Sequence, residues 1–288
     1  RKDSSSKMLI LFVVFLVAAN ALPRSRSPKI WNGNEAEQGE IPYQVAIERL
    51  IFREYYTYFC GGSIVNEKYI LTVAHCLIHD SPNSNIYISA GDLSLEDDSP
   101  FDVKIAASKF IIHESFNKKS LENDIGLIYL KGKIDYNNNV RPATLSEEFF
   151  NPTGLKCRVS GWGMTEDFAL PDILRYVDVD VITNKKCRSE WASSPNTPVL
   201  DTNICTKAKG FTYFGTAIGD SGSPLVCRHE GSIVQVGVTS WGPELGDTNL
   251  PSVFTRIGKY RHWITSNSIE PASASPLSRT PEEYKSIT

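Results

Sequence analysis

The sequence predicts an all-β protein with an antiparallel sandwich or barrel core, and three observations support that prediction. Short runs rich in β-branched and aromatic residues recur along the chain, each bounded by Gly, Pro, Asn, Asp or Ser. Only one segment, near the C-terminus, has a convincing helical pattern. At 288 residues the chain can bury a substantial core, and an all-β double barrel of this size can form one domain.

Eight β-type runs follow one another along the chain. They are YQVAI (43–47), YILTV (69–73), NIYISAG (85–91), KFIIH (109–113), IGLIYL (125–130), LKCRVSGW (155–162), VDVDVI (177–182) and VQVGVTSW (234–241). The turn residues between them are typical of antiparallel connections. The helix is predicted in RIGKYRHWITS, where Ile257, Tyr260 and Ile264 recur at near-helical spacing.

The N-terminal segment is predicted to be a secretory signal. An apolar run from Leu9 to Ala19 follows Lys7 and Met8 and is too short to span a bilayer. We expect cleavage after Ala21 and a secreted, extracellular protein, so residues 1–21 are excluded from the fold. Residues 268–288 are rich in Ser and Pro and are expected to form a disordered tail.

The charge of the chain argues against two classes of partner. Residues 1–29 hold six basic residues and one acidic residue, so the rest of the chain has a net charge of −8 against −3 for the whole. A surface this acidic disfavours nucleic acid and anionic membranes as main partners.

Six cysteines behind a secretory signal predict three disulfides, and spacing alone leaves 15 pairings open. There is no CxxC pair and no histidine spacing suited to zinc, so neither a metal nor a cofactor is expected. The segment DLSLEDDSP (92–100) is acidic, but the number of carboxylates alone does not make a calcium site.

Three separate stretches hold the residues of a hydrolytic centre. LTVAHC contains His75, ENDIGLIYL contains Asp124 and GDSGSP contains Ser221. A serine hydroxyl becomes a good nucleophile when an imidazole takes its proton and a carboxylate fixes the tautomer of that imidazole. Taken singly, each residue also has an ordinary structural interpretation, such as a turn for Asp124. Their joint presence predicts catalysis.

The chain resembles the chymotrypsin-like, or trypsin-fold, serine proteases over residues 30–266. The motifs that carry this resemblance are, in order, FCGGSIV, TVAHC, NDIGLI, SGWG, GDSGSP and TSWG. The resemblance implies two antiparallel six-stranded β-barrels with a C-terminal α-helix, in a protease domain spanning residues 30–267. It also implies that His75 is the general base and then acid, that Asp124 orients it and that Ser221 attacks the scissile carbonyl. The backbone amides of Gly219 and Ser221 would form the oxyanion hole.

The resemblance also suggests a disulfide pattern. The positions of a bridge that commonly braces the family's substrate pocket are Ala217 and Leu245 here, so that bridge is missing. The six cysteines then match the family's other three bridges, which are Cys60–Cys76, Cys157–Cys227 and Cys187–Cys205.

An activation junction is expected between RSRSPK and IWNGNEA, with residues 22–29 as the propeptide. Cleavage after Lys29 would free the amino group of Ile30, which would pair with Asp220 as in related zymogens. The alternative is a basic linker that is cut incidentally. Trp31 stands where the family usually has valine.

The substrate pocket implied by the resemblance has Gly215 at its base, Thr216 beside it, and Gly242 and Ser252 in its walls. The absence of an acidic base disfavours cleavage after Arg or Lys and favours Phe, Tyr, Leu or Met. The alternative is an elastase-like or collagenolytic range. The strand from Ser240 through Trp241 to Gly242 should hydrogen-bond to an extended substrate.

Two departures from the family pattern remain. Ser223 replaces the second glycine of GDSGGP and would be strained if that position requires positive φ. The segment ERLIFREYYTYFC (48–60) is long and is expected to be a solvated hairpin rather than a contact surface for the leaving group.

The resulting functional hypothesis is a secreted serine endopeptidase made as a zymogen. Its expected partners are protein or peptide substrates, an activating protease and protein inhibitors, and we expect a monomer. The alternative is a catalytically silent homologue that binds or regulates a partner.

Overall fold

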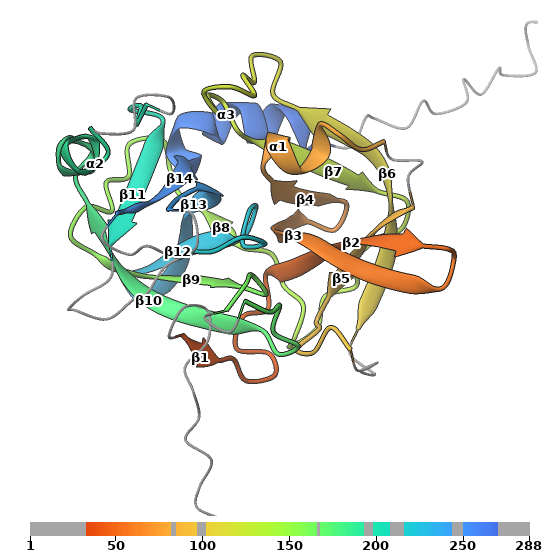
Figure 1. Ribbon diagram of the computed structural model, residues 1–288. Coiled ribbons are helices and arrows are strands. Elements are labelled where there is room, and N and C mark those ends of the chain that lie inside the picture. The colour runs from red at the N-terminus through yellow and green to blue at the C-terminus, as the bar shows by residue number, and fades with distance from the viewer. Residues whose placement is uncertain are drawn as a thin grey trace, which may run out of the picture.

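Two closed antiparallel β-barrels, built from successive parts of the chain, lie side by side (Figure 1). A computed structural model describes residues 33–81, 85–96, 102–165, 168–192, 198–207, 216–243 and 250–269. The predicted signal, the propeptide that ends at Lys29, the residues Ile30, Trp31, Gly215 and Leu245, and most of the predicted tail lie outside these ranges.

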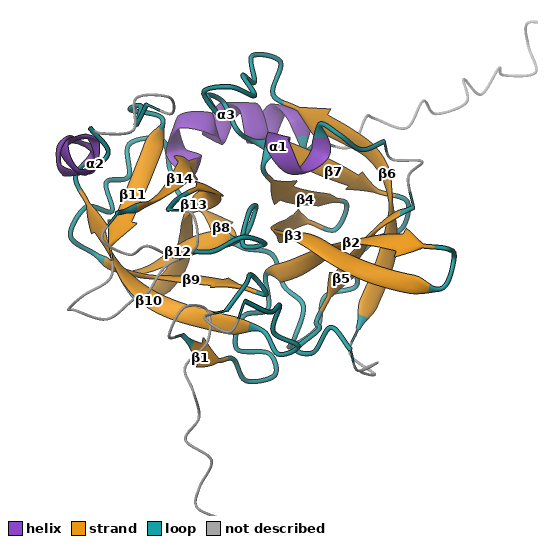
Figure 2. Cartoon of the chain, in the orientation of Figure 1, coloured by secondary structure: helices purple, strands orange, loops and turns teal. Residues whose placement is uncertain are grey.

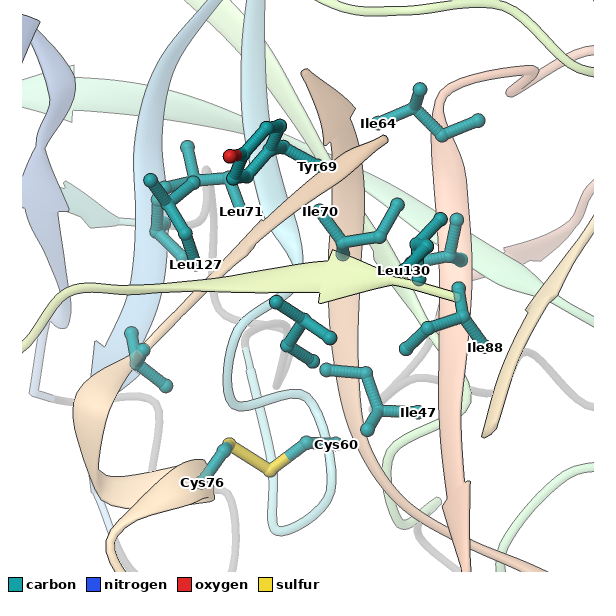
Figure 3. Packing of buried hydrophobic residues seen from close by; sticks show 14 of the residues in the cluster. Ile47, Cys60, Ile64, Tyr69, Ile70, Leu71, Cys76, Ile88, Leu127 and Leu130 are labelled. Carbon is teal, nitrogen blue, oxygen red and sulfur yellow. A yellow bond between two sulfur atoms is a disulfide. The ribbon is translucent and has the colours of Figure 1, made fainter. Parts of the chain in front are cut away.

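The first barrel consists of six strands in the order β2-β3-β4-β7-β6-β5, and it closes where β5 pairs with β2. The strands are β2 (Gln44–Ile51), β3 (Tyr55–Asn66), β4 (Tyr69–Thr72), β5 (Ile86–Ala90), β6 (Val103–Ile112) and β7 (Gly126–Leu130). Apolar side chains alternating along these strands fill the interior. Figure 3 shows Ile47, Ile70, Leu71 and Leu127 in this core, with the Cys60–Cys76 bond at its border.

The second barrel follows the order β10-β11-β14-β13-β12-β9 and closes where β9 pairs with β10. Its strands are β9 (Lys156–Gly161), β10 (Arg175–Ile182), β11 (Asn203–Lys207), β12 (Pro224–His229), β13 (Ser232–Trp241) and β14 (Ser252–Arg256). Two short strands are added, β1 (Asn34–Glu35) beside β10 and β8 (Thr144–Leu145), parallel to β13. The predicted fold of two six-stranded barrels is confirmed.

Helices are few and peripheral (Figure 2). The predicted C-terminal helix is α3 (Ile257–Asn267), and its buried residues Tyr260 and Ile264 belong to the core cluster of the first barrel. The helix α3 therefore follows the last strand of the second barrel and packs against the first barrel. The sequence did not predict α1 (Ala74–Leu77) or α2 (Asn184–Glu190). No helix in the described ranges is both long and apolar enough to cross a membrane.

The structure contains the three disulfides at the pairs that the resemblance implies. Cys60–Cys76 joins β3 to α1, and Cys187–Cys205 joins α2 to β11. Cys157 and Cys227 lie directly opposite each other on β9 and β12, with their Cα atoms 4.1 Å apart. The second barrel thus has two of the three bridges.

The β2–β3 hairpin is exposed at its tip, as predicted. Phe52 is 90% exposed and Tyr55 is 61% exposed. The hairpin is attached to the body by an ion pair between Arg49 and Asp80, with 2.6 Å between nitrogen and oxygen.

Candidate active site

His75 and Asp124 are in direct contact at the edge of the first barrel. His75 lies in the short helix α1. Asp124 is buried and lies two residues before the start of β7. The Nδ1 atom of His75 lies 2.8 Å from Oδ2 of Asp124, and the backbone N–H of His75 donates to Oδ1 at 2.9 Å. With a proton on Nδ1, Nε2 is left to accept one.

The second barrel also holds Asp124. The hydroxyl of Ser240 donates to Oδ2 of Asp124 at 2.6 Å, and the hydroxyl of Thr255 donates to its backbone carbonyl at 2.7 Å. We expected Ser240 to contribute through its backbone, so the sequence analysis missed this side-chain contact. These two bonds fix a carboxylate from one barrel against strands of the other.

Ser221 lies in the turn that precedes β12, where this part of the second barrel contacts β3 of the first. Its carbonyl accepts a hydrogen bond from the N–H of Gly61 at 2.8 Å and lies 3.8 Å from Sγ of Cys76, the residue after His75. Gly222 has φ +83°, and a Cβ there would lie 2.2 Å from the Gly61 carbonyl oxygen. Only glycine fits at that point of the turn.

The contacts of the Ser221 carbonyl with Gly61 and Cys76 therefore place Ser221 near His75. Among the described residues, the Ser221 hydroxyl itself forms no hydrogen bond, to His75 or to any other group. In serine hydrolases this contact is often long until substrate binds.

The backbone around Gly219 leaves two amides available on one turn. The carbonyl of Ile218 accepts from the N–H of Met164 at 2.7 Å, so in the trans peptide the N–H of Gly219 points the opposite way. Neither the Gly219 nor the Ser221 N–H donates to another group within the part of the chain that the structure describes. Such unused donors suit a developing negative charge.

Comparison with known proteins gives the same assignment as the geometry. The family model for trypsin matches residues 30–264. The chain belongs to the trypsin family. It is 34% identical over 245 residues to Trypsin-1 of Astacus astacus, which covers 83% of this chain and all of that protein. It is 32% identical over 260 residues to Serine protease 1 of Homo sapiens, covering 88% and 96% of the two chains.

A third relative is Lectizyme of Glossina austeni, which is 34% identical over 273 residues and covers 90% of this chain and 95% of that protein. As a member of the trypsin family with such relatives along most of its length, the chain is a serine-type endopeptidase that acts on protein substrates.

The carboxylate of Asp220, next to Ser221, is fully buried. It accepts hydrogen bonds from the N–H groups of Gly163 at 2.9 Å and Ala217 at 2.8 Å. A Cβ on Gly163 would lie 2.4 Å from this carboxylate, so the glycine makes room for it. Burial raises the pKa of Asp220 to about 7, and the two backbone hydrogen bonds partly oppose that shift.

The described part of the predicted substrate pocket brings Thr216, Gly242 and Ser252 together. The hydroxyl of Thr216 lies 2.9 Å from that of Ser252, and a Cβ on Gly242 would lie 3.4 Å from Oγ1 of Thr216. Trp241 packs edge-on against Trp191, with ring centroids 4.9 Å apart. The sequence analysis missed Trp191, which no motif marks.

Ser223 is not strained in the way the sequence analysis considered, since it is absent from the residues with positive φ. Its side chain is buried and lies 3.3 Å from Nε2 of Gln44, whose Oε1 accepts from Ser160 at 2.8 Å. A Cβ on Gly61 would lie 2.0 Å from Oγ of Ser223. The extra hydroxyl therefore occupies space that a glycine in the first barrel leaves open.

No group of three or more His, Cys, Asp or Glu side chains able to hold a metal ion occurs in the described ranges, which omit residues 97–101 of the acidic segment.

Proposed function

We propose that the chain cleaves peptide bonds through an acyl-enzyme formed on Ser221. The observation that carries this proposal is the pairing of His75 with a buried Asp124 that receives hydrogen bonds on both carboxyl oxygens. Such a carboxylate fixes the imidazole with Nε2 ready to accept a proton, beside a turn that presents a serine.

The reaction then runs in two halves. Nε2 of His75 takes the Ser221 proton as Oγ attacks the scissile carbonyl, and the N–H groups of Gly219 and Ser221 stabilise the oxyanion. His75 returns the proton to the leaving amine, which departs. Water attacks the resulting ester by the same route in reverse, freeing Ser221 and the carboxylic acid product.

We further propose that the enzyme is secreted as a zymogen and is activated by another protease that cuts after Lys29. The buried Asp220 supports this proposal, because it accepts two backbone hydrogen bonds but has no cationic partner within the described ranges. The ammonium of Ile30 would supply that partner and so stabilise the turn that carries Gly219 and Ser221.

For specificity, we propose cleavage after Phe, Tyr, Leu or Met. No charged side chain stands among Thr216, Gly242 and Ser252, and the hydroxyls of Thr216 and Ser252 hydrogen-bond to each other. A substrate Arg or Lys would lose the hydration of its charge and find no charged partner among these residues. A large apolar side chain carries no charge, so its burial has no such cost.

The test is to cut the precursor after Lys29 and to assay peptides ending in Phe, Leu, Ala or Arg. The processed enzyme should turn over the Phe and Leu peptides fastest, the uncut precursor should be far slower, and Ser221→Ala should be inactive. Fast cleavage after Arg would refute the pocket assignment. A folded, processed sample without turnover would favour the silent homologue instead.

A further inference from the structure

Tyr58 contacts the proposed oxyanion turn from the opposite barrel. It lies on β3 of the first barrel, and its hydroxyl donates to the carbonyl of Gly219 at 2.7 Å. The two residues are 161 positions apart in the sequence. No motif in the sequence pointed to this bond.

The phenol is held in place by its surroundings. Tyr58 is 7% exposed, and its ring packs against Trp162 with centroids 5.9 Å apart. A Cβ on Gly219 would lie 3.6 Å from Cε1 of Tyr58, so the ring itself borders the turn. Burial raises the pKa of Tyr58 above its ordinary range, and the nearby Asp220 raises it further. The hydroxyl therefore stays protonated at neutral pH and can donate to the Gly219 carbonyl.

Three hydrogen bonds define the two peptides that flank Gly219. The N–H of Met164 donates to the carbonyl of the peptide before it. The peptide after it accepts from Tyr58 at its carbonyl and donates from the N–H of Asp220 to the carbonyl of Ala217 at 3.0 Å, so Tyr58 supplies its only hydrogen bond with the other barrel among the described residues. Gly219 has φ +98° and, as a glycine, has many other conformations available once a bond is lost. Rotation about the backbone bonds of Gly219 would change the position of its N–H relative to the Ser221 N–H, two residues further along the same turn.

We propose that Tyr58 is a positioning residue that keeps the Gly219 N–H aimed at the oxyanion. This inference rests on the proposed function, because it assigns Gly219 the role given there. Its effect should appear in the transition state and in bound tetrahedral adducts, and not in the binding of the unreacted substrate.

The main test is Tyr58→Phe, which removes one oxygen and keeps the ring. We expect kcat to fall about 10-fold, the loss of a single buried hydrogen bond, with KM changed less than about twofold. Affinity for a peptide aldehyde, whose adduct with Ser221 places an oxyanion in the site, should fall by a similar factor. Affinity for the matching peptide alcohol should not change.

The matched control is Tyr43→Phe, because Tyr43 is also 7% exposed and lies outside the turn. It should leave kcat and aldehyde affinity unchanged. If Tyr58→Phe behaves like this control, the inference is wrong while the proposed function stands. If Tyr58→Phe only lowers the melting temperature or the fraction of titratable sites, Tyr58 is merely structural and the inference is again wrong.

A second measurement does not depend on turnover. In the Ser221→Ala background, Tyr58→Phe should shift or broaden the backbone amide resonances of Gly219 and Asp220, whereas Tyr43→Phe should not. Unchanged resonances would overturn the inference. Absence of turnover in the processed wild-type enzyme would instead contradict the proposed function.

Discussion

The two barrels have the same number of strands but fill their interiors and secure their strands differently. The core of the first barrel is dominated by isoleucine and leucine, which include Ile47, Ile64, Ile70, Leu71, Ile86, Ile88, Leu127, Ile128 and Leu130. The core of the second is smaller and dominated by valine, with Val159, Val177, Val179, Val181 and Val236 beside a buried disulfide. Smaller side chains bury less apolar area, so the second barrel depends more on its covalent bonds.

The barrels also divide the proposed chemistry. In the proposed reaction the first barrel supplies His75, which moves the proton, and Asp124, which orients it. The second supplies Ser221 and the described pocket residues, which meet the substrate. The contacts of Ser240 with Asp124 and of Tyr58 with Gly219 run in opposite directions between them. Each barrel thus positions a group that belongs to the other, and this interdependence can be tested from either side.

The largest effect is expected from Asp124→Asn. The amide would turn an NH₂ group or a weaker acceptor toward Nδ1 of His75 and favour the wrong tautomer, and in triads of this kind the change costs about 10⁴ in kcat. Steady-state kinetics of the processed enzyme measure it.

Ser240→Ala is the matched change from the second barrel. It leaves the carboxylate in place with one donor fewer, so the loss should be nearer 10-fold. Equal losses in the two variants would show that Ser240 does more than support Asp124.

Removing a disulfide should lower the stability of the protein by different amounts in the two barrels. Cys157 and Cys227 are 70 residues apart, and Cys60 and Cys76 are 16 apart. Loop-closure entropy predicts that replacing Cys157 and Cys227 by alanine lowers the free energy of unfolding by about 4 kcal/mol. Replacing Cys60 and Cys76 should lower it by about 3 kcal/mol. Chemical denaturation of both double variants gives the comparison, and a larger loss for Cys60–Cys76 would contradict it.

Core truncations should show a smaller contrast. Leu127→Ala in the first barrel should cost about 3 kcal/mol, and Val236→Ala in the second should cost about 2 kcal/mol, because fewer carbons are removed. Both residues are almost fully buried, so exposure does not confound the pair. Unfolding midpoints in urea are a suitable measurement, and the reverse order would show that the valine core is the less adaptable one.

The last expected effect is a gradual dependence of the uncut chain's stability on pH. Burial and the neighbouring Asp102 raise the pKa of Asp92, after β5, to about 8, and burial raises that of Asp220 to about 7. Both carboxyls ordinarily titrate at 3.8, so between about pH 4 and pH 8 the folded chain holds protons that the unfolded chain has lost. Stability should therefore fall as the pH rises through this window and then level off.

Asp92→Asn should make stability fall less steeply with pH, because it removes the titrating carboxyl of Asp92 and leaves that of Asp220. Unfolding free energies of the uncut chain from pH 5 to pH 9 provide the measurement. A stability that increases over this range in the wild-type chain would contradict both pKa shifts.

Much of this fold follows from local sequence pattern. Each of the eight predicted β-runs overlaps a strand and extends beyond it by at most one residue at either end, and Ile257, Tyr260 and Ile264 are buried residues of α3. Periodicity did not predict α2, whose seven residues bury only Cys187 and whose start depends on a cap, where the Thr183 hydroxyl accepts from the N–H of Lys186. A helix so short has no apolar stripe to detect.

Some contacts of the candidate site could be predicted from motifs, but those between distant side chains could not. His75 and Asp124 were found through short motifs and are in contact. The bond from Tyr58 to Gly219 and that from Ser240 to Asp124 join residues 161 and 116 positions apart, and only the folded barrels bring them together. The question of strain at Ser223 was also beyond the sequence, because the answer depended on its backbone angle and on the space beside Gly61.

That shared space has a consequence for how this protein can change over generations. The hydroxyl of Ser223 fills the volume that a methyl group on Gly61 would need. A chain that carries this serine cannot accept alanine at position 61 without moving the Ser223 side chain, so a smaller residue at position 223 would have to come first. The order of mutational steps, and not only their final combination, is therefore constrained by two atoms that belong to different barrels.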